Sequence, residues 1–232
     1  MEKLVYVLWR RSDHEPDAFR DDLLDLANGA LLRLGAVRLT LQVADGEAEA
    51  GAGARISRLP SPPAATVSFW LQSPELRAPY EAALDKVVER AAAYEVAESV
   101  PLAADEPLGK RSPGLSMVSF LTPLPGLDRE AFLAHWHDAH RAVALDLQCT
   151  HLYVRDTVVR ALTPDAPRWA GIVAEGFPDG ALADPMRWYR ASSPEELRDR
   201  QRRMLESVRA FLDLSRIEVH PMSRWRLAAG CC

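Results

Sequence analysis

The feature that most constrains this chain is an internal repeat. A shift of 113 positions (118 − 5) places Val5 on Val118 and Phe19 on Phe132, and a shift of 120 (193 − 73) places Ser73 on Ser193. The second half therefore holds seven more residues (120 − 113) before its second helix. Two constant shifts that keep the same order of elements indicate a duplicated unit.

Each half of the sequence predicts the order β-α-β-β-α-β. Short apolar runs and period-two alternation indicate the strands, and apolar residues three or four apart indicate the helices. Such a unit forms a four-stranded antiparallel sheet with two helices on one face. The expected strands are 4–9, 37–43, 66–71, 96–100, 115–121, 150–158, 169–175 and 217–220, and the expected helices are 16–34, 73–92, 128–145 and 194–212.

The second face of each sheet is left uncovered in this arrangement, so we expect the two sheets to cover each other. The predicted fold is α+β, with two ferredoxin-like βαββαβ repeats packed sheet to sheet in one chain as an α/β-barrel, a pseudo-dimer. The expected organisation is an N-terminal repeat at 1–102, a linker at 103–114, a second repeat at 115–226 and a loose tail at 227–232.

One long internal segment, 45–63, is rich in Gly, Ala, Glu and Pro and has no hydrophobic period. Its composition offers little apolar surface to compensate for the entropy of ordering. We therefore expect a mobile or disordered loop there.

The composition excludes several classes of protein. The net charge of −5 over 232 residues argues against a nucleic-acid surface, and no apolar run approaches the length of a membrane span. The chain begins without a secretory leader, so we expect a cytoplasmic protein. Three cysteines, with Cys231 and Cys232 adjacent, form no disulfide framework, and no polybasic stretch precedes that pair to support a lipidated tail.

A histidine on the helix at 128–145 is the main candidate for chemistry. At roughly 100° per residue, Phe132, Trp136 and Ala139 share the apolar face of this helix, with His140 at its edge. In the first half the position aligned with His140 is Ala27. An imidazole on such a face must be hydrogen-bonded or it costs free energy. His140 is therefore either a satisfied packing residue or a proton carrier.

Further candidates lie on the strands after this helix. Tyr153 and Arg155 share a strand face and could stabilise an oxyanion, although each could equally be an ordinary strand residue. Glu175 shares a face with Trp169 and could accept the N–H of an imidazole, or form a salt bridge at the rim. The remaining candidates for substrate binding are Phe132, Trp136, His137, Trp188 and Tyr189.

A metal site is not expected. His135 and His137 lie about 200° apart around a helix, so they cannot converge with His140 on one ion. The sequence also carries neither a phosphate-binding loop nor a dinucleotide glycine fingerprint.

The spacing Phe132-x-x-x-Trp136-x-x-x-His140, with Leu152-Tyr153-Val154 after it, resembles the EthD family over roughly 115–225. The resemblance implies the dimeric α/β-barrel superfamily, whose members pair two such units through their sheets. Relatives in that superfamily include cofactor-free monooxygenases, polyketide cyclases, decarboxylases and haem-degrading enzymes. Their ligands lie between the sheet and the helices of one unit.

We therefore expect an enzyme that acts on a small hydrophobic, carbonyl-rich or aromatic molecule without a metal or an organic cofactor. His140 would carry a proton, and Tyr153 or Arg155 would stabilise the developing oxyanion. The pocket would be confined to the second half, and the equivalent space in the first half would be filled. Cyclisation, dehydration, decarboxylation, isomerisation and cofactor-free oxygenation all fit this arrangement.

Two alternatives remain open at this point. One is a non-catalytic accessory or carrier protein that binds an apolar ligand. The other is a haem-binding protein with a histidine of this helix as the axial ligand. In each case the chain would act as a monomer, complete as a pseudo-dimer, or as a homodimer.

Overall fold

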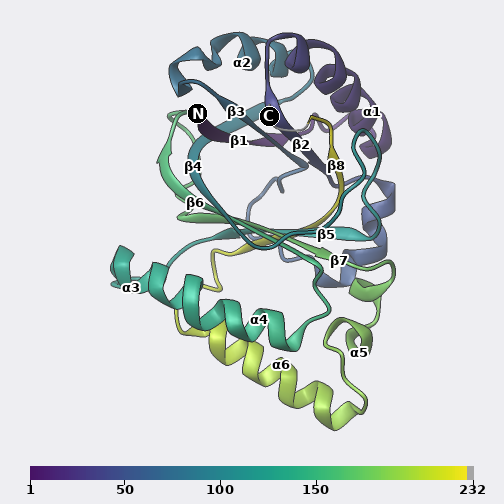
Figure 1. Ribbon diagram of the computed structural model, residues 1–232, viewed down its shortest axis with the longest axis vertical. Coiled ribbons are helices and arrows are strands. Elements are labelled where there is room, and N and C mark those ends of the chain that lie inside the picture. The colour runs from purple at the N-terminus through teal and green to yellow at the C-terminus, as the bar shows by residue number, and fades with distance from the viewer. Residues whose placement is uncertain (229–232) are drawn as a thin grey trace.

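The computed structural model describes residues 1–228 and shows a closed β-barrel between two layers of helices (Figure 1). The strands are β1 (Glu2–Trp9), β2 (Val37–Val43), β3 (Ala65–Leu71), β4 (Arg90–Leu102), β5 (Leu115–Leu121), β6 (Leu152–Ala161), β7 (Gly171–Phe177) and β8 (Glu218–Arg226). The α-helices are α1 (Pro16–Leu26), α2 (Ala78–Leu84), α3 (Arg129–Ala134), α4 (Arg141–Leu147), α5 (Pro185–Trp188) and α6 (Pro194–Arg209). Two π-helical segments, η1 (Ala27–Leu31) and η4 (His135–His140), and three 3₁₀ segments, η2 (Gly46–Ala54), η3 (Pro74–Arg77) and η5 (Ala181–Ala183), complete the elements.

The strands pair in the closed order β1-β3-β2-β8-β5-β7-β6-β4. Each half contributes a sheet with its own four strands in equivalent order, and antiparallel pairs β2–β8 and β4–β6 join the two sheets. The pairing leaves no free sheet edge, which explains why one chain is sufficient to close the barrel. The predicted fold, two ferredoxin-like repeats with their sheets face to face, is confirmed.

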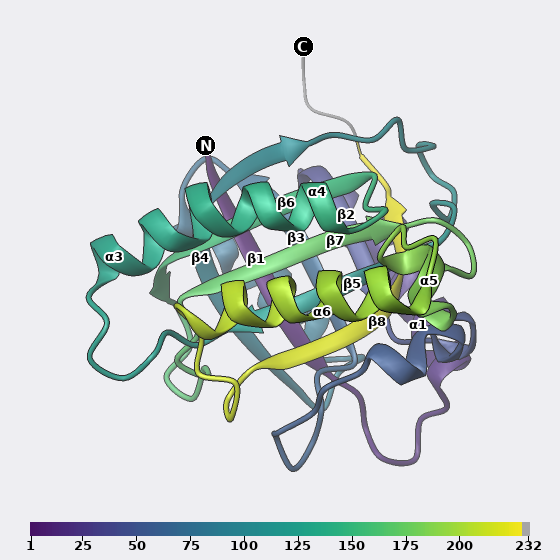
Figure 2. The same cartoon turned by 90° about the horizontal axis from the view of Figure 1, so that it is seen from below.

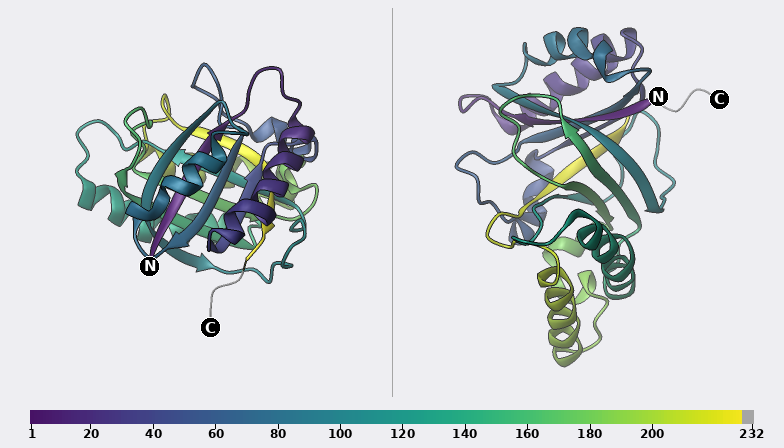
Figure 3. Two further views of the ribbon diagram at one scale, coloured as in Figure 1. Left: turned by 90° about the horizontal axis from the view of Figure 1, so that it is seen from above. Right: turned by 90° about the vertical axis from the view of Figure 1, so that its left-hand side faces the viewer.

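The helices of each half cover the outer face of their own sheet. Helices α1 and α2 lie on one side of the barrel, and α3, α4 and α6 lie on the other (Figures 1 and 3). Side chains alternate along each strand between the barrel interior and the helix-covered face. Three main apolar clusters result, one beneath each helix layer and one inside the barrel.

The second helix of the first half is shorter than expected. The sequence predicts a helix over 73–92, but α2 ends at Leu84 and β4 already begins at Arg90. The run Ala91-Ala92-Ala93 favours a helix by propensity. Pairing with β1 on one side and β6 on the other outweighs that preference, because β4 is needed to close the barrel.

The expectation of a structureless segment at 45–63 is wrong. Residues 46–54 form η2, in which Ala48 and Gly51 are buried. A Cβ on Gly51 would lie 2.9 Å from Pro221 of β8, so the segment packs closely against that strand. The backbone N–H groups of Arg58 and Leu59 donate to the Glu218 carboxylate at 2.5 and 2.7 Å. Packing and hydrogen bonds with β8 of the second half order this segment, although its own composition offers little apolar surface.

The chain stays attached to the barrel after β8. Leu227 is buried and its N–H donates to the Leu39 carbonyl, so the expected loose tail does not begin at 227. Cys231 and Cys232 lie outside the described residues. No helix within residues 1–228 has the length and apolarity that a membrane crossing requires.

Candidate functional site

A cavity of about 280 Å³ lies between the second-half sheet and its helices. Helix α6 runs side by side with the helix made of α3, η4 and α4 over the second-half sheet (Figure 2), and residues of η4 and α6 form the roof of the cavity. Its walls are mostly apolar, as in sites for small organic molecules. The polar and aromatic groups that line it are Arg58, Ser119, Trp136, His140, Gln148, Tyr153, Glu175, Trp188, Tyr189 and Phe211. We call this space the helix-side cavity.

A π-helical segment places His140 in this cavity. Four residues of an α-helix overshoot one full turn by about 40°, whereas the i→i+5 turn of η4 rotates less per residue. Trp136, His140 and Ala144 therefore follow one line beneath the helix, while Ala139 is exposed. The predicted face containing Ala139 is wrong, because the prediction assumed a regular α-helix.

Trp136 sits in a recess that only glycine provides. A Cβ on Gly171 of β7 would collide with the Trp136 indole ring. In the first half the strand position equivalent to Gly171 is Ala65, because Ala65 pairs with Leu8 and Gly171 pairs with Leu121. The helix residue equivalent to Trp136 is the smaller Leu23. The second half has thus exchanged a Leu–Ala contact for a Trp–Gly contact.

His140 is half-buried and is held by one ring nitrogen. Its Nδ1 lies 2.9 Å from Ser207 Oγ on α6, and its ring lies 5.1 Å from that of Phe211. Burial lowers the pKa of His140 to about 4, so the ring is neutral at pH 7. No group within residues 1–228 hydrogen-bonds its Nε2, which leaves that nitrogen for a ligand.

Glu175 is the most unusual polar group in the cavity. Its side chain is buried, and no residue within 1–228 hydrogen-bonds its Oε1. Burial raises the pKa of this carboxyl to about 7. The expected bond to an imidazole is absent: the nearby groups whose titration it affects are Tyr153 and Tyr189. Burial and the Glu175 charge both raise the pKa of Tyr153, so that hydroxyl stays protonated.

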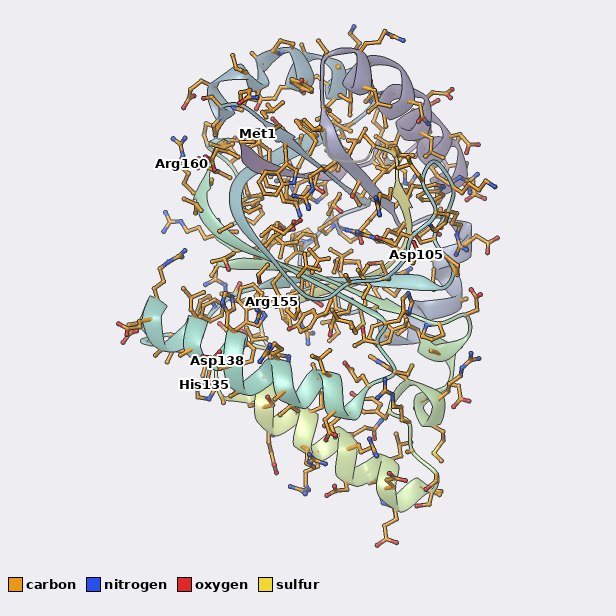
Figure 4. The ribbon with its side chains drawn as sticks, in the orientation of Figure 1. Met1, Asp105, His135, Asp138, Arg155 and Arg160 are labelled. Carbon is orange, nitrogen blue, oxygen red and sulfur yellow. The ribbon has the colours of Figure 1, made fainter. Side chains whose placement is uncertain are left out.

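Four predicted site residues lie outside the cavity. Arg155 donates to Ser99 Oγ at 3.0 Å and to the His137 carbonyl at 2.9 Å, so it holds η4 from the side of the sheet (Figure 4). His137 Nε2 lies 3.2 Å from Thr157 Oγ1, also away from the cavity. Phe132 packs against Trp136 and supports the wall without reaching the space.

Trp169 is the fourth predicted site residue outside the cavity. The prediction that it shares a strand face with Glu175 is wrong. β7 begins at Gly171, so the alternation that includes Glu175 does not extend back to Trp169. The indole lies inside the barrel instead, between Tyr94 and Phe120. Trp188 and Tyr189 do line the cavity, and Trp188 Nε1 has no partner within residues 1–228.

Stacked aromatic rings occupy the equivalent space in the first half. Phe69 pairs with Leu4 across the strands, and Glu175 pairs with Met117. Leu4 and Met117 are equivalent in the repeat (117 − 4 = 113), so Phe69 and Glu175 occupy equivalent positions. Phe69 stacks between Tyr6, at 5.6 Å, and Tyr80, at 4.9 Å. By the same register, Tyr6 stands where Ser119 stands in the second half. The first half fills this space with rings, whereas the second half places small and acidic side chains there.

The helix-side cavity is not confined to the second half, contrary to expectation. Ala54, Ile56 and Arg58 of the first half form part of its wall. The backbone of Ile56 pairs with Val219 of β8, which fixes this wall in place. The site therefore requires both repeats.

Sequence reasoning missed Ser119, Gln148, Ser207 and Arg58. Comparison of the repeats could have found Ser119, because its partner at a shift of 113 is Tyr6. Pairing Glu175 with Phe69 requires a shift of 106 (175 − 69), which neither constant shift supplies. Within residues 1–228 no three His, Cys, Asp or Glu side chains are grouped to hold a metal ion.

No known protein family matches the sequence, and no curated protein matches it. Solved structures do match the fold. An anthrone oxidase-like protein superposes with a TM-score of 0.59 at 10% identity, covering 99% of this chain and 96% of its own. A candidate monooxygenase from Lactobacillus acidophilus NCFM gives 0.52 at 10% identity, over 100% and 97%. One from Fusobacterium nucleatum subsp. nucleatum ATCC 25586 gives 0.52 at 10% identity, over 99% and 95%. The chain thus shares its whole architecture, a dimeric α/β-barrel, with these proteins.

Proposed function

We propose that this protein is an enzyme that binds a small hydrophobic, carbonyl-rich or aromatic molecule in the helix-side cavity and transfers a proton to or from it. The observation that carries the proposal is Glu175. Its buried carboxyl has an unpaired oxygen in an apolar space and a pKa of about 7, so both protonation states are populated near neutral pH. A general acid–base group is most effective when its pKa lies near the working pH.

The surrounding residues suit removal of a proton next to a carbonyl or from a phenol. Ionised Glu175 would accept the proton. Tyr153, which keeps its own proton, would donate a hydrogen bond to the oxyanion that develops on the substrate. His140, neutral and fixed by Ser207, would orient the substrate through Nε2. In this proposal Glu175, and not His140 as expected from the sequence, transfers the proton.

The names of the structural neighbours favour one outcome of this chemistry. One neighbour is described as anthrone oxidase-like and two as candidate monooxygenases. Loss of a proton from a fused-ring ketone such as an anthrone gives an electron-rich anion that O₂ can oxidise without a bound cofactor: one oxygen atom becomes the new ring carbonyl of the quinone, and the other leaves as water with the two hydrogens of the oxidised carbon. The resemblance of residues 132–154 to the EthD family agrees with such a substrate. We therefore propose cofactor-free oxygenation first, with cyclisation, decarboxylation or isomerisation as other uses of the same proton transfer.

The test uses anthrone as the probe substrate, with O₂ consumption and product mass as the measurements. Glu175→Gln should keep the fold and lower kcat by about two orders of magnitude or more. His140→Ala and His140→Gln should raise KM more than they lower kcat, because they remove orientation and leave the base. Glu130→Gln, on the exposed face of α3, is the matched control. Full activity of Glu175→Gln would contradict the proposal.

Binding without turnover is the second candidate, and the same experiment addresses it. The mostly apolar cavity would then hold anthrone saturably while the wild-type protein consumes no O₂. Haem fits less well: a neutral imidazole with a free Nε2 suits axial ligation, but about 280 Å³ is small even for a drug-sized ligand, for which about 300–1,000 Å³ is usual. Absorbance near 400 nm (roughly the Soret region) after reconstitution would detect haem.

A further inference from the structure

A second cavity lies inside the barrel, on the opposite side of the sheet from the helix-side cavity. Its volume is about 330 Å³. β6 separates the two spaces, because Tyr153 faces the helices while Leu152 and Val154 face the barrel interior. We call this space the barrel cup. Its charged and aromatic lining consists of Lys3, Arg38, Trp70, Glu98, Glu106, Asp156, Arg224 and Arg226.

The interior of the barrel is divided between an apolar end and this charged end. Rings and aliphatic side chains such as Trp9, Phe120 and Trp169 fill the apolar end. At the charged end the inward positions of the same strands carry ionisable groups: β1 continues from Val5 to Lys3, and β8 continues from Met222 to Arg224 and Arg226. At the other end β8 carries one buried pair, His220 and Glu218, whose charges are satisfied within the protein, so the larger group of ionisable side chains is specific to the charged end.

Every carboxylate of the barrel cup already has a cationic partner. Lys3 Nζ lies 2.6 Å from Glu98 and 2.8 Å from Asp156. Arg224 Nε lies 2.7 Å from Glu106. Lys3 and Asp156 are both buried, so this network is a built part of the fold. The cup therefore offers no free negative charge to a ligand.

Positive charge is in excess, and it lies on two arginines. Arg226 forms no ion pair and no side-chain hydrogen bond with any residue within 1–228. Arg38 approaches Glu98 only at 3.5 Å, and its guanidinium lies 4.9 Å from the centre of the Trp70 ring. The four cations Lys3, Arg38, Arg224 and Arg226 face three carboxylates, so the cup complements an anion.

The backbone at Arg38, one of the two arginines that carry the excess charge of the barrel cup, is strained. Its φ is +52°, a region that bulky residues rarely adopt. The strain coincides with an irregularity in the β2–β3 pairing between Val37 and Thr40. A β-bulge can redirect a side chain at a site, and strain of this kind persists where the fold holds it.

The remaining wall of the barrel cup is apolar. Val100, Leu152, Val154 and Ala174 line it, together with Ala103 and Ala104 of the connection between the repeats. That connection is tied to the strand that carries Arg226, since Gly109 N–H donates to the Arg226 carbonyl at 2.8 Å. A ligand in the cup would thus contact both repeats and the segment that joins them.

We propose that the barrel cup binds a small organic carboxylate with an apolar body, its carboxylate held by Arg38 and Arg226. Guanidinium groups match a carboxylate geometrically and pair with it through two hydrogen bonds. The apolar body would lie against Val154 and its neighbours. This site is separate from the helix-side cavity and does not depend on its proposed chemistry.

The probe is benzoate, titrated calorimetrically into the full-length protein, with benzamide as the uncharged isostere. Benzoate should bind saturably and benzamide should not. Arg226→Gln and Arg38→Gln should each weaken benzoate binding by about tenfold or more, as loss of a charge-assisted hydrogen bond predicts. Both arginines lie at the rim, and circular dichroism of each variant checks that it is folded.

Two control variants show whether benzoate occupies the barrel cup. Arg33→Gln removes an exposed arginine from the opposite surface of the first repeat, and Arg58→Gln removes the arginine of the helix-side cavity. Both should bind benzoate as the wild type does. The proposal is overturned if benzoate does not saturate, if Arg58→Gln rather than Arg226→Gln loses binding, or if inorganic phosphate binds as tightly as benzoate.

Discussion

The two helix-covered faces of this barrel share the same strand order and have opposite interiors. In the first half Tyr6, Phe69 and Tyr80 stack and fill the space beneath the helices. In the second half the positions of Tyr6 and Phe69 are taken by Ser119 and Glu175, and a cavity of about 280 Å³ is present. The cavity thus coincides with the loss of two rings at these strand positions, where a small and an acidic side chain stand instead.

The comparison also shows where stability and function separate. The first half buries aromatic surface, which stabilises it. The second half buries a carboxyl without a full set of hydrogen bonds, which costs free energy. Buried carboxyls with shifted pKa values cluster at functional sites, so this destabilising group marks the second half as the functional one.

The largest expected effect on ligand affinity is the closure of the second-half cavity by the side chains of the first half. Ser119→Tyr combined with Glu175→Phe should lower the affinity for anthrone by roughly a hundredfold or more, because rings would occupy the ligand volume. Fluorescence titration measures the affinity. Ser215→Tyr, at an exposed position, controls for an added ring. Unchanged affinity in the double variant would show that the ligand binds elsewhere.

The reverse exchange should destabilise the first half. Phe69→Glu removes a stacked ring and buries a carboxyl among the rings of Tyr6 and Tyr80, with an expected loss of about 4 kcal/mol or more in the free energy of unfolding. Urea denaturation at pH 8, where the carboxyl would be charged in the unfolded chain, measures this loss. Phe69→Leu should cost much less. If both variants were equally stable, the first-half space would not be filled as described.

The pH dependence of stability should report the buried Glu175. Its folded pKa of about 7 lies above an unfolded value of about 4.3. The folded state therefore binds more protons between these values, and stability falls as pH rises through this window, by roughly 4 kcal/mol in total. His140 acts oppositely, since its folded pKa of about 4 makes stability fall as pH drops below about 6.5.

A difference measurement isolates the glutamate. Unfolding curves of the wild type and of Glu175→Gln, recorded from pH 4 to pH 8, share the His140 contribution. Their difference should grow as pH rises above about 4.3 and level off above about 7. A difference that is constant with pH would mean that the carboxyl is not buried in the protonated form.

The smallest expected effect concerns the contact between Trp136 and Gly171. Gly171→Ala should cost about 1–3 kcal/mol, because the added methyl group collides with the indole. Combining it with Trp136→Leu recreates the Leu23–Ala65 contact of the first half. A double-mutant cycle should show that the second change recovers part of the first loss, by about 1 kcal/mol. Strict additivity would argue against the contact.

The repeat made most of the fold predictable. A constant shift revealed the equivalent elements, and the uncovered sheet faces required a closed barrel. The candidate site was predictable where the constant shift of 113 applies. Comparison of Trp136 with Leu23, and of His140 with Ala27, singled out both residues as differences between the halves. The prediction was wrong at Trp169, because a strand end cannot be located from alternation alone when apolar residues precede it.

The sequence by itself determined the duplicated unit, the number of strands in each sheet and the helix that carries the site, because hydrophobic period and element order are local properties. Only the tertiary structure decided which side chains share a cavity. The attachment of segment 45–63 to β8 depends on contacts between distant residues, and the π-helical turn at His135–His140 is not visible in the hydrophobic pattern. The environment that moves the pKa of Glu175 to about 7 also depends on contacts between distant residues, because burial is a property of the closed barrel and its helix layer.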